Sequence, residues 1–340
     1  MKGDPLPWIL RSTCPSTEFV LDKNTVLGVY EVSTNILMRN TNNSNDTAGI
    51  SSTQVSSIAF SLDGETLYVV NEAAVPCVKA WDVKNGELRA KKRLPKNSEQ
   101  TWLVPVRDGV ILAINEDSPE LWNLQLSKCT RRWPDLHQIA DIIPVSGERV
   151  LCAKDTFELN IINTVSGEIE ATMFTHGKHC IACNGKCLVI TSDDRTVQLS
   201  NDKTVFWEKD MSILCGLFSP DESLVILQRQ WFGEDLLIVN AVSGITLFCI
   251  TCMPIPFGFQ FISDEEIIVS SFVKNAKCLR LFNVKSGDLL SVLPVEGEWS
   301  CLAACRKERL IAVGLHDSST SFRAFQVKLP CDKDGSGNSR

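Results

Sequence analysis

A motif that returns about every forty residues constrains the fold of this chain more than any other feature of its sequence. Each copy is an apolar run that ends in a bulky residue followed by a carboxylate or amide residue, and Ser200 is the one exception to bulkiness. The pairs are Tyr30-Glu31, Trp81-Asp82, Trp122-Asn123, Ile162-Asn163, Ser200-Asn201, Val239-Asn240, Phe282-Asn283 and Phe325-Gln326. From Trp81 onward they are 41, 40, 38, 39, 43 and 43 residues apart. A repeat of this length predicts a propeller or a solenoid.

Two turn signals divide each copy into four short strands. Four pairs continue into the same glycine turn, at residues 81–87, 162–168, 239–245 and 282–288. Glycine at a fixed offset supplies the positive φ that a tight connection between two strands requires. A second turn precedes each pair, as in FSLDGETL at 60–67, and helical periodicity is nearly absent. Four antiparallel strands that are apolar on both faces predict a blade packed between two others, and hence an all-β propeller of seven to eight four-stranded blades.

The repeats resemble the WD-repeat family of β-propellers. The match is clearest in FSLDGETLYVV followed by WDVKNGE (60–70 and 81–87), in DDRTVQLSN (193–201) and in FSPDESLVIL (218–227). The resemblance covers roughly residues 18–328 and implies a ring of blades that engages other proteins. Tryptophan occupies the named position in only two of the eight pairs.

The hydrogen-bonded tetrad that braces typical WD blades is incomplete in this sequence. The fifth copy has Asp194, with Ser192 and His176 as further candidates, but Ser200 replaces the tryptophan. Stability is therefore expected to come mostly from apolar packing between blades. The copies with N-x-x-S-G are similar to the propellers of NACHT- and apoptosome-type signalling ATPases. Since the chain has no G-x-x-x-x-G-K-[ST] loop, any ATPase module would lie outside it.

The number of blades depends on how the ring closes. Eight copies favour eight blades, with a seven-bladed ring and an irregular N-terminal extension as the alternative. The last copy supplies three strands, so either LPWILR at 6–11 provides the fourth or the last blade keeps an open edge. We expect one domain over residues 1–330, an exposed loop at 40–54 and a disordered tail at 331–340.

Composition narrows the choice of partner and compartment. The 340 residues carry 34 Lys and Arg against 41 Asp and Glu, a net charge of -7. On this balance, and because no Lys/Arg cluster is identified, neither nucleic acid nor membrane is expected as a partner. The 14 cysteines lie mostly in apolar runs without a signal-peptide h-region, so we expect reduced thiols and a cytoplasmic protein. The expected partners are other proteins, with the oligomeric state open.

One segment, THGKHCIACNGKC, has the spacing of a metal site. His176, His179, Cys180, Cys183 and Cys187 provide H-x-x-H and C-x-x-C patterns that suit tetrahedral zinc. In the repeat frame, however, CIAC is itself a strand. Because side chains alternate along a strand, Cys180 and Cys183 are expected on opposite faces, which disfavours a shared ion. We therefore expect no metal and no cofactor, and keep His176, His179, Cys180 and Cys183 as weak candidates.

No constellation in the sequence predicts catalysis. There is no G-x-S-x-G elbow, and the four histidines have no obvious Ser or Cys partner. The favoured interpretation is a non-enzymatic scaffold for protein–protein interaction. One alternative is an enzyme or small-molecule binder that uses the central channel. Another is the sensor part of a longer signalling protein that restrains an ATPase.

Three stretches on one rim have the composition of an interface. The loops between second and third strands, and between one blade and the next, gather on the rim where WD-repeat proteins usually engage partners. RRWPDLH, QRQWFGED and VEGEWS are assigned to such loops and combine arginine with large aromatic residues, as interface hot spots do. The candidate contacts are Arg131, Arg132, Trp133, Arg229, Trp231, Phe232 and Trp299. The competing interpretation is that each tryptophan folds over a blade edge.

Overall fold

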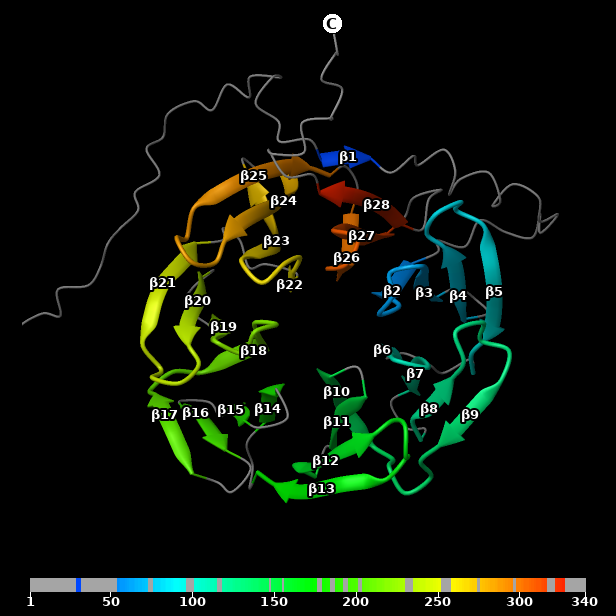
Figure 1. Cartoon of the computed structure of the whole chain (residues 1–340), viewed down its shortest axis with the longest axis horizontal. Coiled ribbons are helices and arrows are strands. Elements are labelled where there is room, and N and C mark those ends of the chain that lie inside the picture. Colours follow the sequence, from blue (N-terminus) through cyan, green and yellow to red (C-terminus); the bar gives the residue numbers. More distant parts are fainter. Residues whose placement is uncertain are drawn as a thin grey trace, which may run out of the picture.

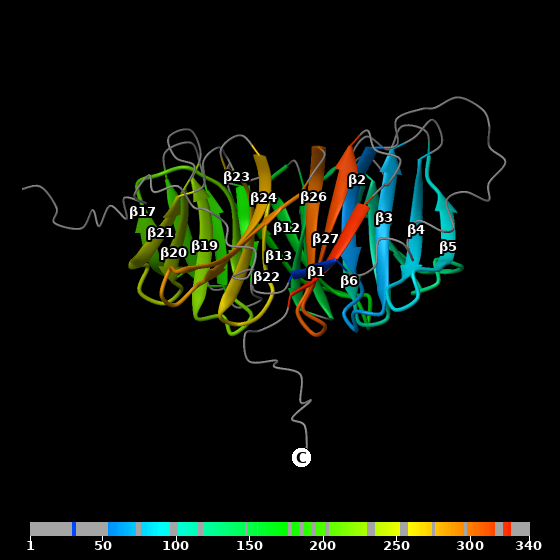
Figure 2. The same ribbon diagram turned by 90° about the horizontal axis from the view of Figure 1, so that it is seen from above.

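Seven four-stranded antiparallel sheets surround a common axis and form a β-propeller (Figure 1). The structure is a computed structural model that describes residues 29–31, 54–72, 76–95, 101–114, 118–146, 148–154, 156–175, 179–183, 187–191, 195–200, 204–229, 235–251, 258–273, 276–295, 298–316 and 322–327. Edge-on, the ring is a disc whose strands run between its two faces (Figure 2). The predicted fold class is confirmed.

Blades 1 to 6 take their strands in chain order from the axis outward (Figure 1). Blade 1 consists of β2 (Gln54–Phe60), β3 (Thr66–Glu72), β4 (Cys77–Asp82) and β5 (Leu88–Arg93). Blade 2 consists of β6 (Thr101–Val106), β7 (Gly109–Ile114), β8 (Glu120–Trp122) and β9 (Cys129–Arg132). Blade 3 consists of β10 (Ile139–Ser146), β11 (Arg149–Lys154), β12 (Glu158–Asn163) and β13 (Ile169–Phe174). Blade 4 consists of β14 (His179–Cys183), β15 (Cys187–Thr191), β16 (Thr196–Ser200) and β17 (Val205–Lys209). Blade 5 consists of β18 (Ile213–Phe218), β19 (Leu224–Arg229), β20 (Asp235–Asn240) and β21 (Thr246–Thr251). Blade 6 is β22 (Phe259–Phe261), β23 (Glu266–Val273), β24 (Ala276–Asn283), β25 (Leu289–Pro294).

Blade 7 joins the two ends of the described chain. It consists of β26 (Glu298–Cys305), β27 (Leu310–His316), β28 (Phe322–Val327) and, as its outer strand, β1 (Val29–Glu31). β1 runs antiparallel to β28, with Tyr30 opposite Gln326. The first described strand therefore completes the last blade and closes the ring.

The preference for eight blades was wrong, because the described residues form seven. Tyr30-Glu31 fits the repeat pattern but belongs to the fourth strand of blade 7 rather than to a blade of its own. The proposed closing strand LPWILR and the predicted tail lie outside the described residues. So does the predicted loop, apart from Gln54, which begins β2.

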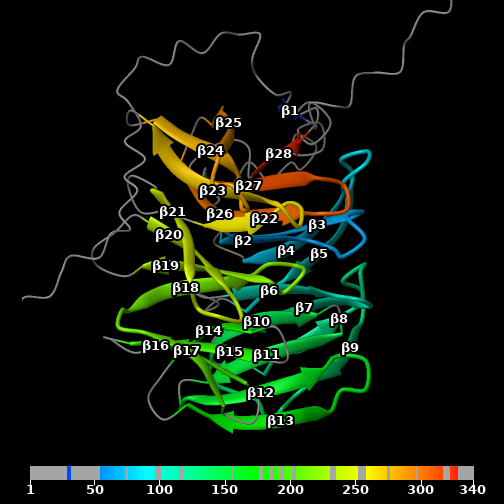
Figure 3. The ribbon, with the colours of Figure 1, turned by 60° about the vertical axis from the view of Figure 1, so that its left-hand side comes forward.

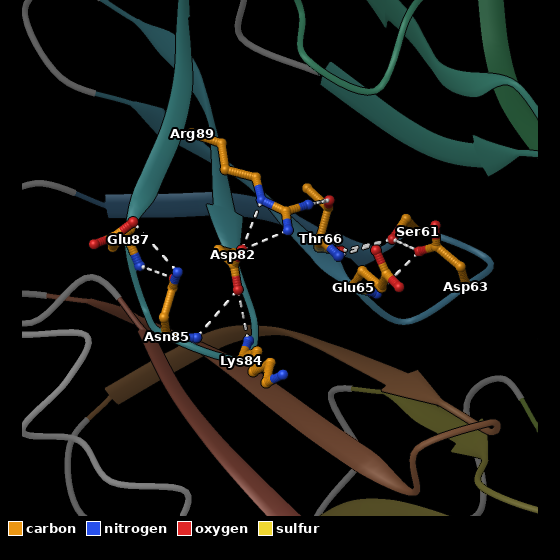
Figure 4. Close-up of polar contacts among 9 residues, drawn as sticks. All are labelled: Ser61, Asp63, Glu65, Thr66, Asp82, Lys84, Asn85, Glu87 and Arg89. Atoms are coloured by element: carbon orange, nitrogen blue, oxygen red, sulfur yellow. Dashed lines mark hydrogen bonds and ion pairs between the residues drawn. The ribbon is translucent and has the colours of Figure 1, made fainter.

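The repeated Asp or Asn explains the turn between the third and fourth strands. In blade 1, Oδ1 of Asp82 accepts hydrogen bonds from the backbone N–H of Lys84 (2.8 Å) and Asn85 (3.1 Å). Gly86 follows with a φ of 71° and donates its N–H to the Asp82 carbonyl. Figure 4 shows this turn, with Arg89 bridging Asp82 and Thr66. Equivalent turns begin at Asn163, Asn240 and Asn283.

Apolar packing between neighbouring sheets supplies the core. Seven buried clusters are present among the described residues, and each one joins the facing sides of two adjacent blades, including blades 7 and 1. Figure 3 shows blade 2 lying between blades 1 and 3 in this way. Because each sheet has both faces covered by its neighbours, the strands are apolar on both sides.

Aromatic side chains also connect blades through single hydrogen bonds. Each donates to a backbone carbonyl in the turn between third and fourth strands of the next blade. The contacts are Tyr68 Oη to Leu124 O (3.1 Å), Trp133 Nε1 to Gly167 O (2.9 Å) and Trp207 Nε1 to Ala241 O (3.1 Å). These bonds satisfy polar groups that burial would otherwise leave without partners.

Candidate functional site

The first group of predicted rim residues, Arg131, Arg132 and Trp133, lies where blade 2 packs against blade 3. Arg131 and Arg132 lie in strand β9 rather than in a rim loop, and Trp133 directly follows that strand. Trp133 is buried in the core shared by the two blades and is held there by its bond to Gly167. For Trp133 the structure therefore favours the competing interpretation, in which the tryptophan packs within the propeller.

The two arginines beside Trp133 also have internal contacts. Arg132 forms an ion pair with Glu120. Arg131 lies against the turn of blade 3, since a Cβ added to Gly167 would come within 1.6 Å of its Nη1 atom. The ion pair accounts for the position of Arg132, whereas the buried Nη1 of Arg131 has no hydrogen-bond partner among the described residues.

The second group is only partly described. Arg229 ends strand β19 and is half-buried, whereas Trp231 and Phe232 lie outside the described residues. Trp299 was assigned to a rim loop, but its backbone lies in strand β26 opposite Leu315. Its side chain is outside the described part of the structure, so its contact with a partner stays a prediction.

The candidate metal ligands fall in and before strand β14. His176 is outside the described residues, and only the backbone of His179, Cys180 and Cys183 is described. The register shifts between Cys180 and Ala182, and Cys180 and Cys183 come opposite Ile190 and Leu188. Since these partner positions are two residues apart on a regular strand, simple alternation does not place the two cysteines on opposite faces. Since the side chains are not described, the expectation that the two cysteines face opposite ways stays a prediction. Among residues with described side chains, no cluster of three or more His, Cys, Asp or Glu could hold one.

Asp141 is a carboxylate on the innermost strand of blade 3. Its carboxylate accepts hydrogen bonds from the backbone N–H of Ile142 (2.8 Å) and from the side chain of Trp102 in blade 2. Burial raises the pKa of Asp141, and these two donors offset only part of the effect. A carboxylate with a perturbed pKa beside the axis is the feature that best fits the alternative of a channel-sited ligand.

Replacing Asp141 by Asn will change how stability depends on pH. The folded state holds the Asp141 proton more tightly than the unfolded chain, so this carboxyl stabilises the fold fully only below its unfolded pKa. That stability is lost as pH rises through the folded pKa. The stability of the Asp141→Asn variant should therefore increase relative to that of the wild type as pH rises from acid to neutral. Urea unfolding across this range measures the gain, and parallel pH profiles would contradict it.

The cysteine side chains described near the axis are poorly suited to nucleophilic chemistry. Burial raises the pKa of Cys152 and of Cys215 to about 12 in each case, with Asp141 adding to the effect. Both thiols are therefore protonated at neutral pH, and the thiolate is the nucleophilic form. Cys152 packs in the core between blades 2 and 3, and the thiol of Cys215 donates a hydrogen bond to Gln228 Oε1 at 3.0 Å.

An exposed apolar patch lies where blade 4 meets blade 5. We use the name apolar patch for five exposed side chains, Val205 and Phe206 on β17 of blade 4 and Val242, Ile245 and Leu247 on the turn and outer strand of blade 5. The two blades are in direct contact here, because a Cβ added to Gly244 would lie 2.4 Å from the Cβ of Trp207. Nearby, Lys209 Nζ donates to Thr246 Oγ1 at 3.0 Å. Val242 and Ile245 are 71% and 63% exposed, so the tip of the turn presents its apolar atoms to solvent.

The other repeats show that this turn does not need apolar residues in order to fold. The positions equivalent to Val242 hold Lys84, Val165 and Lys285 in blades 1, 3 and 6, and those equivalent to Ile245 hold Glu87, Glu168 and Asp288. In all four turns the side-chain Oδ1 of the Asp or Asn accepts a hydrogen bond from the backbone N–H two residues later. Blade 5 alone among them has apolar residues at both positions. The sequence contained this signal, which an alignment of the four turns would have shown.

The fold defines the class of protein to which the chain belongs, a seven-bladed β-propeller. No protein-family model and no curated protein matches the sequence. Within the ranges that the structure describes, no helix has the length and hydrophobicity of a membrane span.

Proposed function

We propose that this chain is a protein–protein interaction scaffold built on a WD-repeat-like propeller. One observation carries the proposal: in the apolar patch, Val242 and Ile245 expose aliphatic side chains at two turn positions that both hold charged residues in the equivalent turns of blades 1 and 6. Exposed apolar groups that the fold does not require are typical of surfaces that a partner covers. The activity proposed is binding rather than catalysis, in the cytoplasm, without nucleic acid or membrane as partner.

The rim residues Arg229, Trp231, Phe232 and Trp299 remain a second proposed contact surface. The two described positions, Arg229 at the end of β19 and Trp299 near the start of β26, lie on the opposite side of the disc from the turn that carries Val242, because alternate connections of an antiparallel sheet lie at opposite ends. A role as regulatory or sensor part of a larger signalling assembly rests on the resemblance of the repeats alone. The apolar patch is therefore the surface to test first.

The test gives the blade 5 turn the charged residues that occupy the equivalent positions in the turn of blade 1. Val242→Lys with Ile245→Glu reproduces the Lys and Glu of blade 1, so stability should change by no more than about 0.5 kcal/mol. The partners that bind the wild-type chain in cell lysate should be lost, as measured by affinity purification with quantitative mass spectrometry. Burying a lysine and a glutamate against an apolar partner surface without counter-charges accounts for the loss.

The matched control is Val165→Lys in blade 3. It introduces the same charge at the same position of a turn, outside the apolar patch. This variant should retain the partners. If the blade 5 variant folds normally and keeps every partner, the apolar patch is not the binding surface.

A further inference from the structure

One cross-strand position holds complementary side chains in two blades and a like-charged pair in blade 1. The directly opposed residues are Glu120 and Arg132 in blade 2, Asn160 and Thr172 in blade 3, and Lys79 and Lys91 in blade 1. In blade 2 they form an ion pair, and in blade 3 the hydroxyl donates to the amide oxygen at 2.8 Å. Two ammonium groups in this position repel each other, so blade 1 lacks the internal partner that blades 2 and 3 have.

Further positive charge surrounds the lysine pair. Strand β5 reads LRAKKR and holds four cations in six residues, so the expectation that the chain has no Lys/Arg cluster was wrong. Arg93 lies opposite Cys77, two residues along from the Lys79–Lys91 pair and on the same face. Lys92 points to the other face and lies over the ring of Trp122 in blade 2. Lys79 is half-buried, and this burial lowers its pKa, with Lys91 adding to the effect.

The carboxylates nearby are already engaged or absent. Asp82 binds Arg89, which also donates to Thr66, so the charge of Arg89 is neutralised within the blade (Figure 4). In the described part of the chain, no carboxylate forms an ion pair with Lys79, Lys91 or Arg93. Three cations on one face therefore have no counter-charge there.

Protection of an exposed edge does not account for this arrangement. Lysine on an outer strand discourages aggregation, which would explain Lys91 and Arg93. Lys79, however, lies on β4, one strand further in, where it protects no edge. Its position directly opposite Lys91 instead brings two ammonium groups to one point, which favours binding of a carboxylate between them.

We propose that blade 1 binds an acidic, extended segment of a partner protein, which adds to the outer edge of β5 as a fifth strand. β5 is the last strand of its sheet, and among the described strands none pairs with its outer edge. Carboxylates at alternate positions of an added strand face the same side as Lys91 and Arg93, because side chains on one face recur every second residue. This surface is on a different blade from the apolar patch, so the proposal does not depend on it.

The shape of the charged surface favours a peptide over a nucleic acid. The three cations of this cluster, Lys79, Lys91 and Arg93, lie on the outer two strands of one blade, in a chain with a net charge of -7. A nucleic acid requires contacts to phosphates along an extended basic surface. The backbone edge of β5 adds hydrogen bonds that only another peptide backbone can pair in register.

The experiment uses the purified full chain and a fluorescein-labelled peptide of alternating Glu and Thr. Fluorescence anisotropy should show saturable binding that weakens as salt is added. A peptide of the same composition, with all Glu before all Thr, should bind more weakly because its carboxylates no longer alternate. Equal affinity for the two peptides, or tighter binding of a single-stranded oligonucleotide, would overturn the proposal.

Variants of blade 1 locate the site. Lys91→Gln should weaken binding of the alternating peptide about tenfold, the value of one charge-assisted hydrogen bond. Lys84→Gln, which removes an exposed lysine from the same blade, should leave affinity unchanged. The urea midpoint of Lys91→Gln should equal or exceed that of the wild type, because a repulsion is removed, so weaker binding cannot result from unfolding. Equal peptide affinity in the two variants would contradict the site.

Discussion

Replacing Val29, Tyr30 and Glu31 together by proline will lower the stability of the propeller by about 3 kcal/mol, because proline cannot donate to the strand ladder. These residues form β1, the strand that completes blade 7. Without β1, the outer edge of β28 is exposed, and open edges pair with other chains. Urea unfolding measures the loss of stability, and sedimentation velocity should show self-association that increases with concentration.

The control for this prediction replaces the same three residues by threonine. Threonine keeps the backbone N–H and favours strands, so the closure should survive and stability should fall by less than about 1 kcal/mol. Hydrogen exchange gives a local check, since the amides of Phe322–Val327 should lose protection only in the proline variant. Unchanged protection in the proline variant would show that β1 does not close the ring.

The repeat alone was sufficient to predict the blades. The second residue of each pair is Asp or Asn in most copies because its side chain binds the turn that follows, and glycine adopts the positive φ of that turn. Both requirements are local, so they are visible in sequence. The way the ring closes is not local. Tyr30-Glu31 fits the pattern of a third strand, and only its pairing with β28 shows that it is a fourth strand.

The candidate site was harder to predict, because burial and register decide it. Trp133 follows an arginine pair and suggests an interface, yet the turn of blade 3 buries it. Lys79 and Lys91 are twelve positions apart in the chain, and only the register of β4 and β5 makes them opposite neighbours. Such facts depend on how neighbouring strands align and on what the next blade covers. A single repeat read by itself contains neither.

Replacing Tyr68 by Ala will have the largest effect of any single substitution considered for this chain, a loss of about 4 kcal/mol in stability. Tyr68 is fully buried in the core that joins blades 1 and 2, and its hydroxyl donates to the carbonyl of Leu124. The smaller side chain leaves a cavity between two sheets and a carbonyl without its donor. Urea unfolding measures the loss, and a change below about 1 kcal/mol would mean that the two blades do not share this core.

Tyr68→Phe separates the hydrogen bond from the packing, with an expected loss of about 1 kcal/mol because only the hydroxyl is removed. Burial raises the pKa of Tyr68, so its contribution is complete below the unfolded pKa and is lost as pH rises toward the folded value. The gap between wild type and Tyr68→Phe should therefore narrow in alkaline solution. The chain has two tyrosines, so in a Tyr30→Phe background the absorbance of tyrosinate reports Tyr68 alone. It should appear only as the protein unfolds, and ionisation of the folded protein near the ordinary tyrosine pKa would show that blade 2 does not cover this side chain.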